Sequence, residues 1–200
     1  MVSLICRHRW NALASVLFLI ACVPGIQAQD GAITLPLNLA QLTTRAALVV
    51  HARVTYAHVE PHPQYHNLAS VIVTLSVLDV LKGTAGKQIT FRQFIWSPRD
   101  IADRAGYREG DELVLFLNRV TAAGFTSPVG LQQGRFRVVA AGGEPNVVVT
   151  TASPILFEGL SKWNANLSAR ARQLIAQPPG RVPFSVLKEL VHALQGGTNR

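Results

Sequence analysis

The alternation of apolar and polar residues along the chain predicts a β-rich domain. Residues 47–59 (ALVVHARVTYAHV) are rich in β-branched side chains, and Val71, Val73, Leu75 and Val77 recur with period two in 68–83 (LASVIVTLSVLDVLKG), as in a strand with one buried face. Further strands are predicted at 87–96 and 111–120, with two or three short ones within 127–151, where glycines interrupt the pattern. Five or six meandering strands would most simply close into a small barrel, because closure removes exposed sheet edges.

Helical spacing appears before and after these strands. A short helix is expected from about Leu39 to Ala46, with Asn38 as its N-cap. Apolar residues at three- and four-residue steps predict an amphipathic helix in 155–176, and a second helix follows in 183–195. The fold class is therefore mainly β with helical additions (α+β), with one N-terminal and two C-terminal helices.

The first residues have the features of a secretory signal. Arg7 and Arg9 precede an apolar run of about a dozen residues, Pro24-Gly25 breaks it, and Ala28 is a small residue at a cleavage position. We expect a signal peptide at 1–28, a barrel domain at 29–152, and a helical extension at 153–200 that packs on the barrel. The alternative is a lipobox at LIAC (19–22), in which Cys22 would be lipidated.

Both interpretations place the protein outside the cytoplasm, either free in the periplasm or medium or attached by lipid to the envelope. The chain contains 19 Lys and Arg against 11 Asp and Glu, a formal charge of +8. Cys6 and Cys22 are its only cysteines. The mature chain would therefore have no disulfide, thiolate nucleophile or thiolate metal ligand.

A resemblance runs from residue 42 to residue 139. LTTRAALVVHARV, VIVTLSVLDVLKG, ITFRQF, YREGDELVLFL and VGLQQGRFRVV occur in this order. Together they resemble a family of uncharacterised secreted bacterial proteins with an OB-like barrel, similar to the netrin and tissue-inhibitor-of-metalloproteinase modules. The metalloproteinase inhibitors use an N-terminal cysteine, whereas the expected mature chain begins Gln29-Asp30-Gly31, so that mechanism does not carry over.

The stretch HVEPHPQYH (58–66) is the candidate metal site. His58, His62 and His66 are evenly spaced, and zinc or another divalent metal takes imidazole ligands. Pro61 and Pro63 disfavour the helix that would bring such residues to one face. The simpler interpretation is a solvent-exposed hairpin connection, in which case no cofactor is expected.

The residues do not predict an enzyme. No serine lies in a G-x-S-x-G turn, and GLQQGRF (130–136) lacks the Lys-Ser/Thr ending of a phosphate-binding loop, so its glycines more simply permit a sharp turn. No catalytic group of nucleophile, base and orienting acid can be assembled.

The basic residues predict a binding surface. Arg92, Phe94 and Trp96 alternate on one face of the third predicted strand, while Arg135 and Arg137 share a face of a later one. OB-like barrels bind ligands with such basic and aromatic residues, although an ordinary solvent-facing sheet is the alternative.

The function expected from these observations is an exported, non-enzymatic binding domain of the cell envelope. It would engage a protein or an anionic polymer through a barrel face or loop. Export argues against nucleic acid, and a membrane is expected only if Cys22 is lipidated. The alternatives are a metal-binding protein built on the histidine hairpin and an inhibitor that inserts a loop into an extracellular protease.

Overall fold

The chain divides into two compact units, Met1–Gly31 and Ala32–Arg200. The computed structural model describes part of the second unit: residues 35–95, 101, 103–141, 144–149, 155–176 and 180–196. The predictions of a signal peptide, of lipidated Cys22 and of a surface position for Trp96 therefore lie outside the described residues. Within the described residues, no helix has the length and apolar character needed to cross a membrane.

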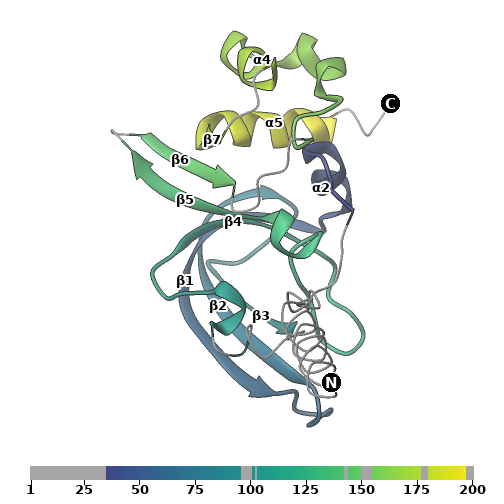
Figure 1. The fold of residues 1–200 in the computed structure, drawn as a ribbon, viewed down its shortest axis with the longest axis vertical. Coiled ribbons are helices and arrows are strands. Elements are labelled where there is room, and N and C mark those ends of the chain that lie inside the picture. Colours follow the sequence, from purple (N-terminus) through teal and green to yellow (C-terminus); the bar gives the residue numbers. More distant parts are fainter. Residues whose placement is uncertain are drawn as a thin grey trace, which may run out of the picture. The chain divides into compact units, whose positions relative to one another are not determined.

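The described unit is built on one antiparallel sheet (Figure 1). Its strands are β1 (Leu48–Pro61), β2 (Ala69–Lys82), β3 (Gln88–Phe94), β4 (Glu112–Leu117), β5 (Arg135–Ala141), β6 (Glu144–Val149) and β7 (Arg181–Pro183). They lie in the order β3-β2-β1-β4-β5-β6-β7. The predicted strands correspond to β1–β6, whereas the three-residue β7 falls in a stretch expected to be a linker. The fold is mainly β with helical additions, as predicted.

The sheet is open, with β3 and β7 at its two edges, so the closed barrel stays a prediction. The connection after β4 returns to the β3 edge, where Thr126 N donates a hydrogen bond to Arg92 O (2.9 Å) beside an isolated bridge between Arg92 and Phe125. The three-strand ribbon β1–β2–β3 is therefore covered at this edge by a loop.

Both faces are buried along β4 and along the first residues of β1, which explains the nearly continuous apolar sequence of β4. Val49 and Val114 face one cluster of buried residues, which includes the helices, while Val50 and Leu115 face a second cluster formed with β2 and β3. A strand buried on both faces cannot show the apolar–polar alternation of a surface strand.

Helix α2 (Leu39–Arg45) begins at Asn38, as predicted. Asn38 Oδ1 accepts a hydrogen bond from Gln41 N (2.8 Å), and Gln41 Oε1 accepts one from Asn38 N (3.0 Å). This reciprocal capping box satisfies donors that a helix start would leave unpaired. At the other end, Lys82 Nζ donates to the carbonyls of Thr43 (2.6 Å) and Ala46 (2.6 Å), which ties α2 to β2.

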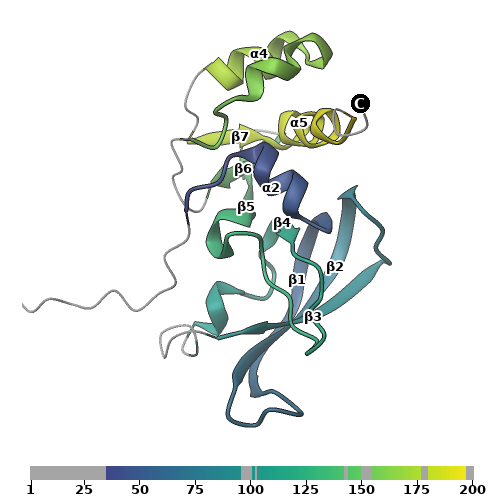
Figure 2. The ribbon, with the colours of Figure 1, turned by 90° about the vertical axis from the view of Figure 1, so that its right-hand side faces the viewer.

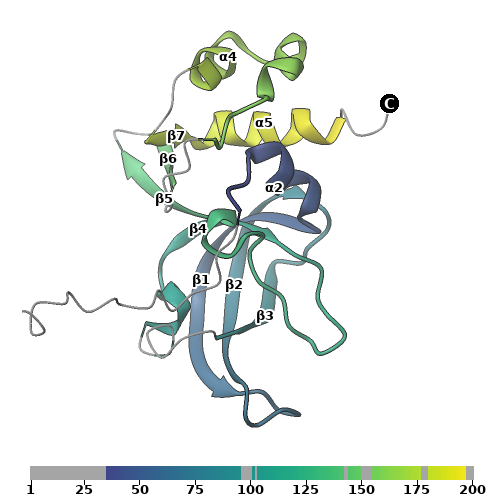
Figure 3. The ribbon, with the colours of Figure 1, turned by 45° about the vertical axis from the view of Figure 1, so that its right-hand side comes forward.

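The predicted helix over 155–176 is divided in two. A 3-10 helix, η3 (Leu160–Asn166), precedes α4 (Ala169–Ala176). Between them, Ser168 Oγ accepts from Ala171 N (3.2 Å), while Ser168 N and Oγ donate to Glu189 of α5 (Phe184–Gly196). Ser168 thus starts a new helix instead of continuing the old one. Figures 2 and 3 show α5 between α4 and the sheet.

Two further 3-10 helices, η1 (Arg104–Gly106) and η2 (Leu131–Gly134), lie in the connections beside β4. Gly130, before η2, has a φ of 62°, and a Cβ on Gly134 would lie 2.6 Å from Val129 O. The glycines of GLQQG therefore permit a sharp turn at this point, as predicted.

Candidate functional site

The side chain of His62 fastens the tip of the β1–β2 hairpin to the loop 119–126. His62 is only 3% exposed. Its Nε2 donates to Ala123 O (2.9 Å), and its Nδ1 accepts from the backbone N of Gln64 and of Tyr65 (3.2 Å each). This set of partners requires the neutral imidazole with its proton on Nε2.

Aromatic contacts extend from His62 to the β3 edge of the sheet. The His62 ring stacks on Tyr65 with centroids 5.0 Å apart and lies tilted on Phe125 at 4.6 Å. Phe125 in turn meets Phe94 of β3 edge to face at 6.2 Å. Because these contacts hold the two loops together, we treat residues 56–68 and 119–126 as one surface and call it the hairpin end.

The structure does not bring the three candidate metal ligands together. His58 is exposed on β1, His66 is exposed in the loop, and both ring nitrogens of His62 are engaged in hydrogen bonds. Among the described residues, no group of three or more His, Cys, Asp or Glu side chains has the arrangement of a metal site. A metal at His62 would have to replace the hydrogen bonds that fasten the hairpin.

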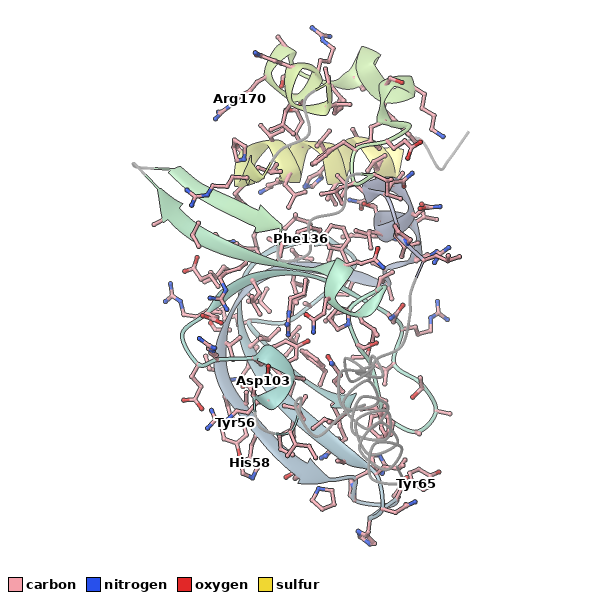
Figure 4. The ribbon with its side chains drawn as sticks, viewed as in Figure 1. Tyr56, His58, Tyr65, Asp103, Phe136 and Arg170 are labelled. Atoms are coloured by element: carbon pink, nitrogen blue, oxygen red, sulfur yellow. The ribbon has the colours of Figure 1, made fainter. Side chains whose placement is uncertain are left out.

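Two exposed rings lie beside each other on the outer face of β1. Tyr56 is 46% exposed, and its ring centroid lies 6.2 Å from that of His58 (Figure 4). Their partners on β2 are Thr74 and Ile72. Tyr65, in the loop, is 47% exposed although its ring stacks on His62.

Arg92 lies on the same outer face but is not a free cation. Its Nη2 contacts Glu60 Oε1 at 2.5 Å, and its Nη1 donates to Ser70 Oγ (2.8 Å). The Arg92 side chain is only 16% exposed. Glu60 therefore largely neutralises the charge of Arg92. Ser70 is fully buried, and its hydroxyl donates to Glu60 O.

Arg135 and Arg137 share a face of β5, with Phe136 buried on the other face, as predicted. In the sheet, β5 is separated from β3 by β2, β1 and β4, so Arg92 belongs to a different part of it. Arg137 Nη2 pairs with Asp111 Oδ2 (3.1 Å). The structure thus gathers only two of the three predicted arginines.

The second of these arginines, Arg135, supports an unusual turn. Its guanidinium lies 4.9 Å from the Tyr107 ring centroid and donates to Ala105 O (2.5 Å). Arg104, Ala105 and Gly106 all have positive φ (55°, 53° and 77°), a conformation that residues with a Cβ adopt rarely. Arg135 therefore serves the fold at this turn.

A buried imidazole lies where α5 begins to cover the sheet. His51 of β1 is 8% exposed, and its ring centroid lies 4.5 Å from that of Phe184, the first residue of α5. Its Nε2 is 3.4 Å from Glu112 Oε2 without the alignment of a hydrogen bond. Burial lowers the pKa of His51, although Glu112 acts in the opposite direction.

Charged residues surround this imidazole. The hydrogen bond from Lys188 lowers the pKa of Asp79, the cross-strand neighbour of His51, and the one from Arg53 lowers the pKa of Glu112. Lys188 Nζ lies 2.6 Å from Asp79 Oδ2. These paired charges anchor α5 and the strands to each other.

A groove of about 440 Å³ opens beside this cluster. Its charged lining residues are Arg53, Glu112, Arg137 and Asp111, and each arginine pairs with one of the acids. The groove thus satisfies its own charges and attracts neither anions nor cations strongly.

The residues of the loop 119–126 were missed in the sequence. Ala123 and Phe125 contact His62 across about sixty residues of chain, and no local pattern reveals such a contact. The one available signal was Thr121-Ala-Ala-Gly124, which marks a turn. Comparison with protein-family models, with curated protein sequences and with solved structures gives no match for this chain.

Proposed function

We propose that this protein is an exported, non-enzymatic binding domain of the cell envelope that engages a protein partner through the hairpin end. The observation that carries the proposal is the pair of half-exposed tyrosines of the hairpin end: Tyr65, whose ring stacks on the buried His62, and Tyr56 on β1. A rigid surface loses little conformational entropy when it binds.

The composition of the hairpin end supports a protein as the partner. Tyrosine is enriched at the centres of protein interfaces because its ring buries a large apolar area while its hydroxyl keeps a polar contact. Val120, 59% exposed at the start of the loop 119–126, adds apolar area. Half of the large hydrophobic side chains that are exposed among the described residues therefore lie on this surface.

The position of the hairpin end also supports the OB-like interpretation. OB-like modules bind ligands with strands 2 and 3 and with the loops that follow strands 1 and 4. Here the hairpin tip follows β1 and the loop 119–126 follows β4, and the two loops contact each other. We also propose that the open sheet is related to an OB-like barrel in which the loop 119–126 covers the β3 edge.

The test is capture of a partner from the envelope fraction on immobilised protein. The Tyr56→Ser/Tyr65→Ser variant should lose a partner that the unchanged protein retains. Leu78→Ser is the matched control, because Leu78 is 47% exposed on β2 outside the hairpin end. A partner that both variants retain equally, or that Leu78→Ser also loses, would contradict docking at this surface.

Two measurements test the remaining parts of the proposal. Mass spectrometry of the protein from the envelope should find an N-terminus at Gln29, or a lipidated Cys22 in the alternative; an intact Met1 would refute export. If the captured partner is a protease that the unchanged protein inhibits and the tyrosine variant does not, the binding domain acts as a loop-inserting inhibitor.

A further inference from the structure

A second groove, of about 460 Å³, lies where α2, η3 and α5 meet. Its lining includes Asn38, Gln41, Thr44 and Arg45 on the α2 side and Lys162 and Trp163 of η3. We call it the helical groove. Its volume lies within the range of small-molecule sites in proteins. Figures 1 and 3 show α2 and the tip of the β1–β2 hairpin at opposite ends of the sheet, so the helical groove is separate from the hairpin end.

The helical groove is positively charged. Arg45 and Lys162 line it, and none of its lining residues is acidic. In the part of the chain that the structure describes, neither cation forms an ion pair with a carboxylate. The groove beside Arg53 and Arg137 differs in this respect, because its two acids neutralise its arginines. Of these two grooves, only the helical groove therefore presents an anion with positive charge that no lining acid neutralises.

An aromatic ring forms part of the same surface. Trp163 is half-buried and packs against the core beneath the helices, which fixes the indole. Lys162 Nζ lies over the ring, 4.2 Å from its centroid, so the ammonium covers part of one ring face and a ligand would contact the rest of the indole beside it. Indole rings provide an apolar surface for the C–H groups of a ligand, while the cation contributes charge.

Polar side chains complete the lining from the α2 side. The Asn38 amide is engaged by Gln41 N and Glu158 O, and Gln41 Oε1 accepts from Asn38 N, which fixes both side chains. The NH2 group of Gln41 can donate to a ligand, and the Thr44 hydroxyl, on the exposed side of the helix, can both donate and accept, as a ligand with several hydroxyl groups requires.

We propose that the helical groove binds an anionic saccharide. The acidic group would lie between Arg45 and Lys162, the hydroxyls would meet Gln41 and Thr44, and a sugar ring would contact Trp163. A bare phosphate is best held by backbone N–H groups at a helix start or turn, whereas this groove is lined by side chains with hydroxyl, amide, indole and cationic groups. The chemistry of the lining therefore matches a charged sugar better than a simple anion.

The test is isothermal titration of the full chain with a heparin-derived hexasaccharide at 50 mM and 150 mM NaCl. We expect Arg45→Gln/Lys162→Gln to weaken binding at least tenfold. Lys87→Gln/Arg108→Gln is the matched control, because it removes the same charge from exposed residues outside the groove and should stay within twofold of the unchanged protein. Tyr56→Ser/Tyr65→Ser should also leave the affinity unchanged, which separates this site from the hairpin end.

Three results would overturn the proposal. Equal weakening by the two charge variants would show binding by net charge alone. Binding of vesicles with 30% phosphatidylglycerol but not of the hexasaccharide would make the ligand a lipid surface. If the groove variant does not fold, titration of the unchanged isotope-labelled protein decides: resonances of Thr44 and the Trp163 indole must shift, and shifts confined to other residues would refute the site.

Discussion

The His62 side chain gives the sharpest test of the hairpin end. In His62→Ala, the hydrogen bond to Ala123 O and the ring contacts with Tyr65 and Phe125 disappear, while water can replace Nδ1 as the acceptor for the amides of the exposed residues Gln64 and Tyr65. The hydrogen bond contributes about 1 kcal/mol, and each aromatic contact about 0.5–1.5 kcal/mol. We therefore expect the local opening of the hairpin end to become about 2–4 kcal/mol easier.

Hydrogen exchange measures this opening directly. A change of about 2–4 kcal/mol corresponds to exchange about 30- to 1,000-fold faster. The amides of Gln64 and Tyr65 should respond most, because they donate to His62 Nδ1, and the amide of Thr126 should follow. Amides of the β1–β4 pairing should change little, because the perturbation is local.

Two companion variants separate the contributions. In His62→Asn, the amide oxygen occupies roughly the place of Nδ1 and can still accept from Gln64 N and Tyr65 N, as in an Asx-turn. Its exchange should lie between those of the unchanged protein and His62→Ala. His66→Ala is the control, because His66 is exposed in the same loop. If hydrogen exchange in His62→Ala stays within threefold of the His66→Ala values, the His62 side chain does not hold the hairpin tip on the loop 119–126.

Three further predictions concern stability. The pKa of His51 lies below its ordinary 6.5, so the unfolded state binds the proton first, and the free energy of unfolding should fall as the pH drops below about 6.5. The pKa values of Asp79 and Glu112 are also lowered, so these two carboxyls should add a further loss of stability below about pH 4.5. Thermal melts from pH 7.5 to 3 check this, and His51→Gln should flatten the upper part of the curve. Burial raises the pKa of Tyr107 to about 12, so stability should fall by about 2–3 kcal/mol between pH 10 and 12, with Tyr107→Phe abolishing the slope in urea titrations. Lys82→Met removes the hydrogen bonds to the end of α2 and should cost about 1.5–3 kcal/mol in urea unfolding, whereas an unchanged midpoint would show that α2 does not depend on them.

The elements that the sequence predicted well are those that local chemistry determines. The start of α2 follows from Asn38 and Gln41, which cap each other three residues apart. The bounds of β1 and β2 follow from runs of β-branched residues ended by the Pro-rich tip and by Gly83. Such signals depend on neighbours along the chain, so a single sequence is enough to read them.

The elements that were missed depend on distant contacts. The 155–176 segment divides at Ser168 because Glu189 of α5 accepts from its backbone and hydroxyl. The strand β7 exists because Arg181–Pro183 pairs with β6. Neither partner can be identified from the local sequence, which reads only as an apolar helical pattern followed by a proline-rich linker.

The same distinction applies to charge. The composition shows a surplus of basic residues, but ion pairs with carboxylates determine which of these residues present an uncompensated charge. On the sheet, Glu60 and Asp111 neutralise Arg92 and Arg137, the residues that the strand pattern put forward as a basic surface. Near the helices, Arg45 and Lys162 line a groove without acids. We therefore expect the anionic ligand at the helical groove, on residues that lie outside the basic surface predicted from the strand pattern.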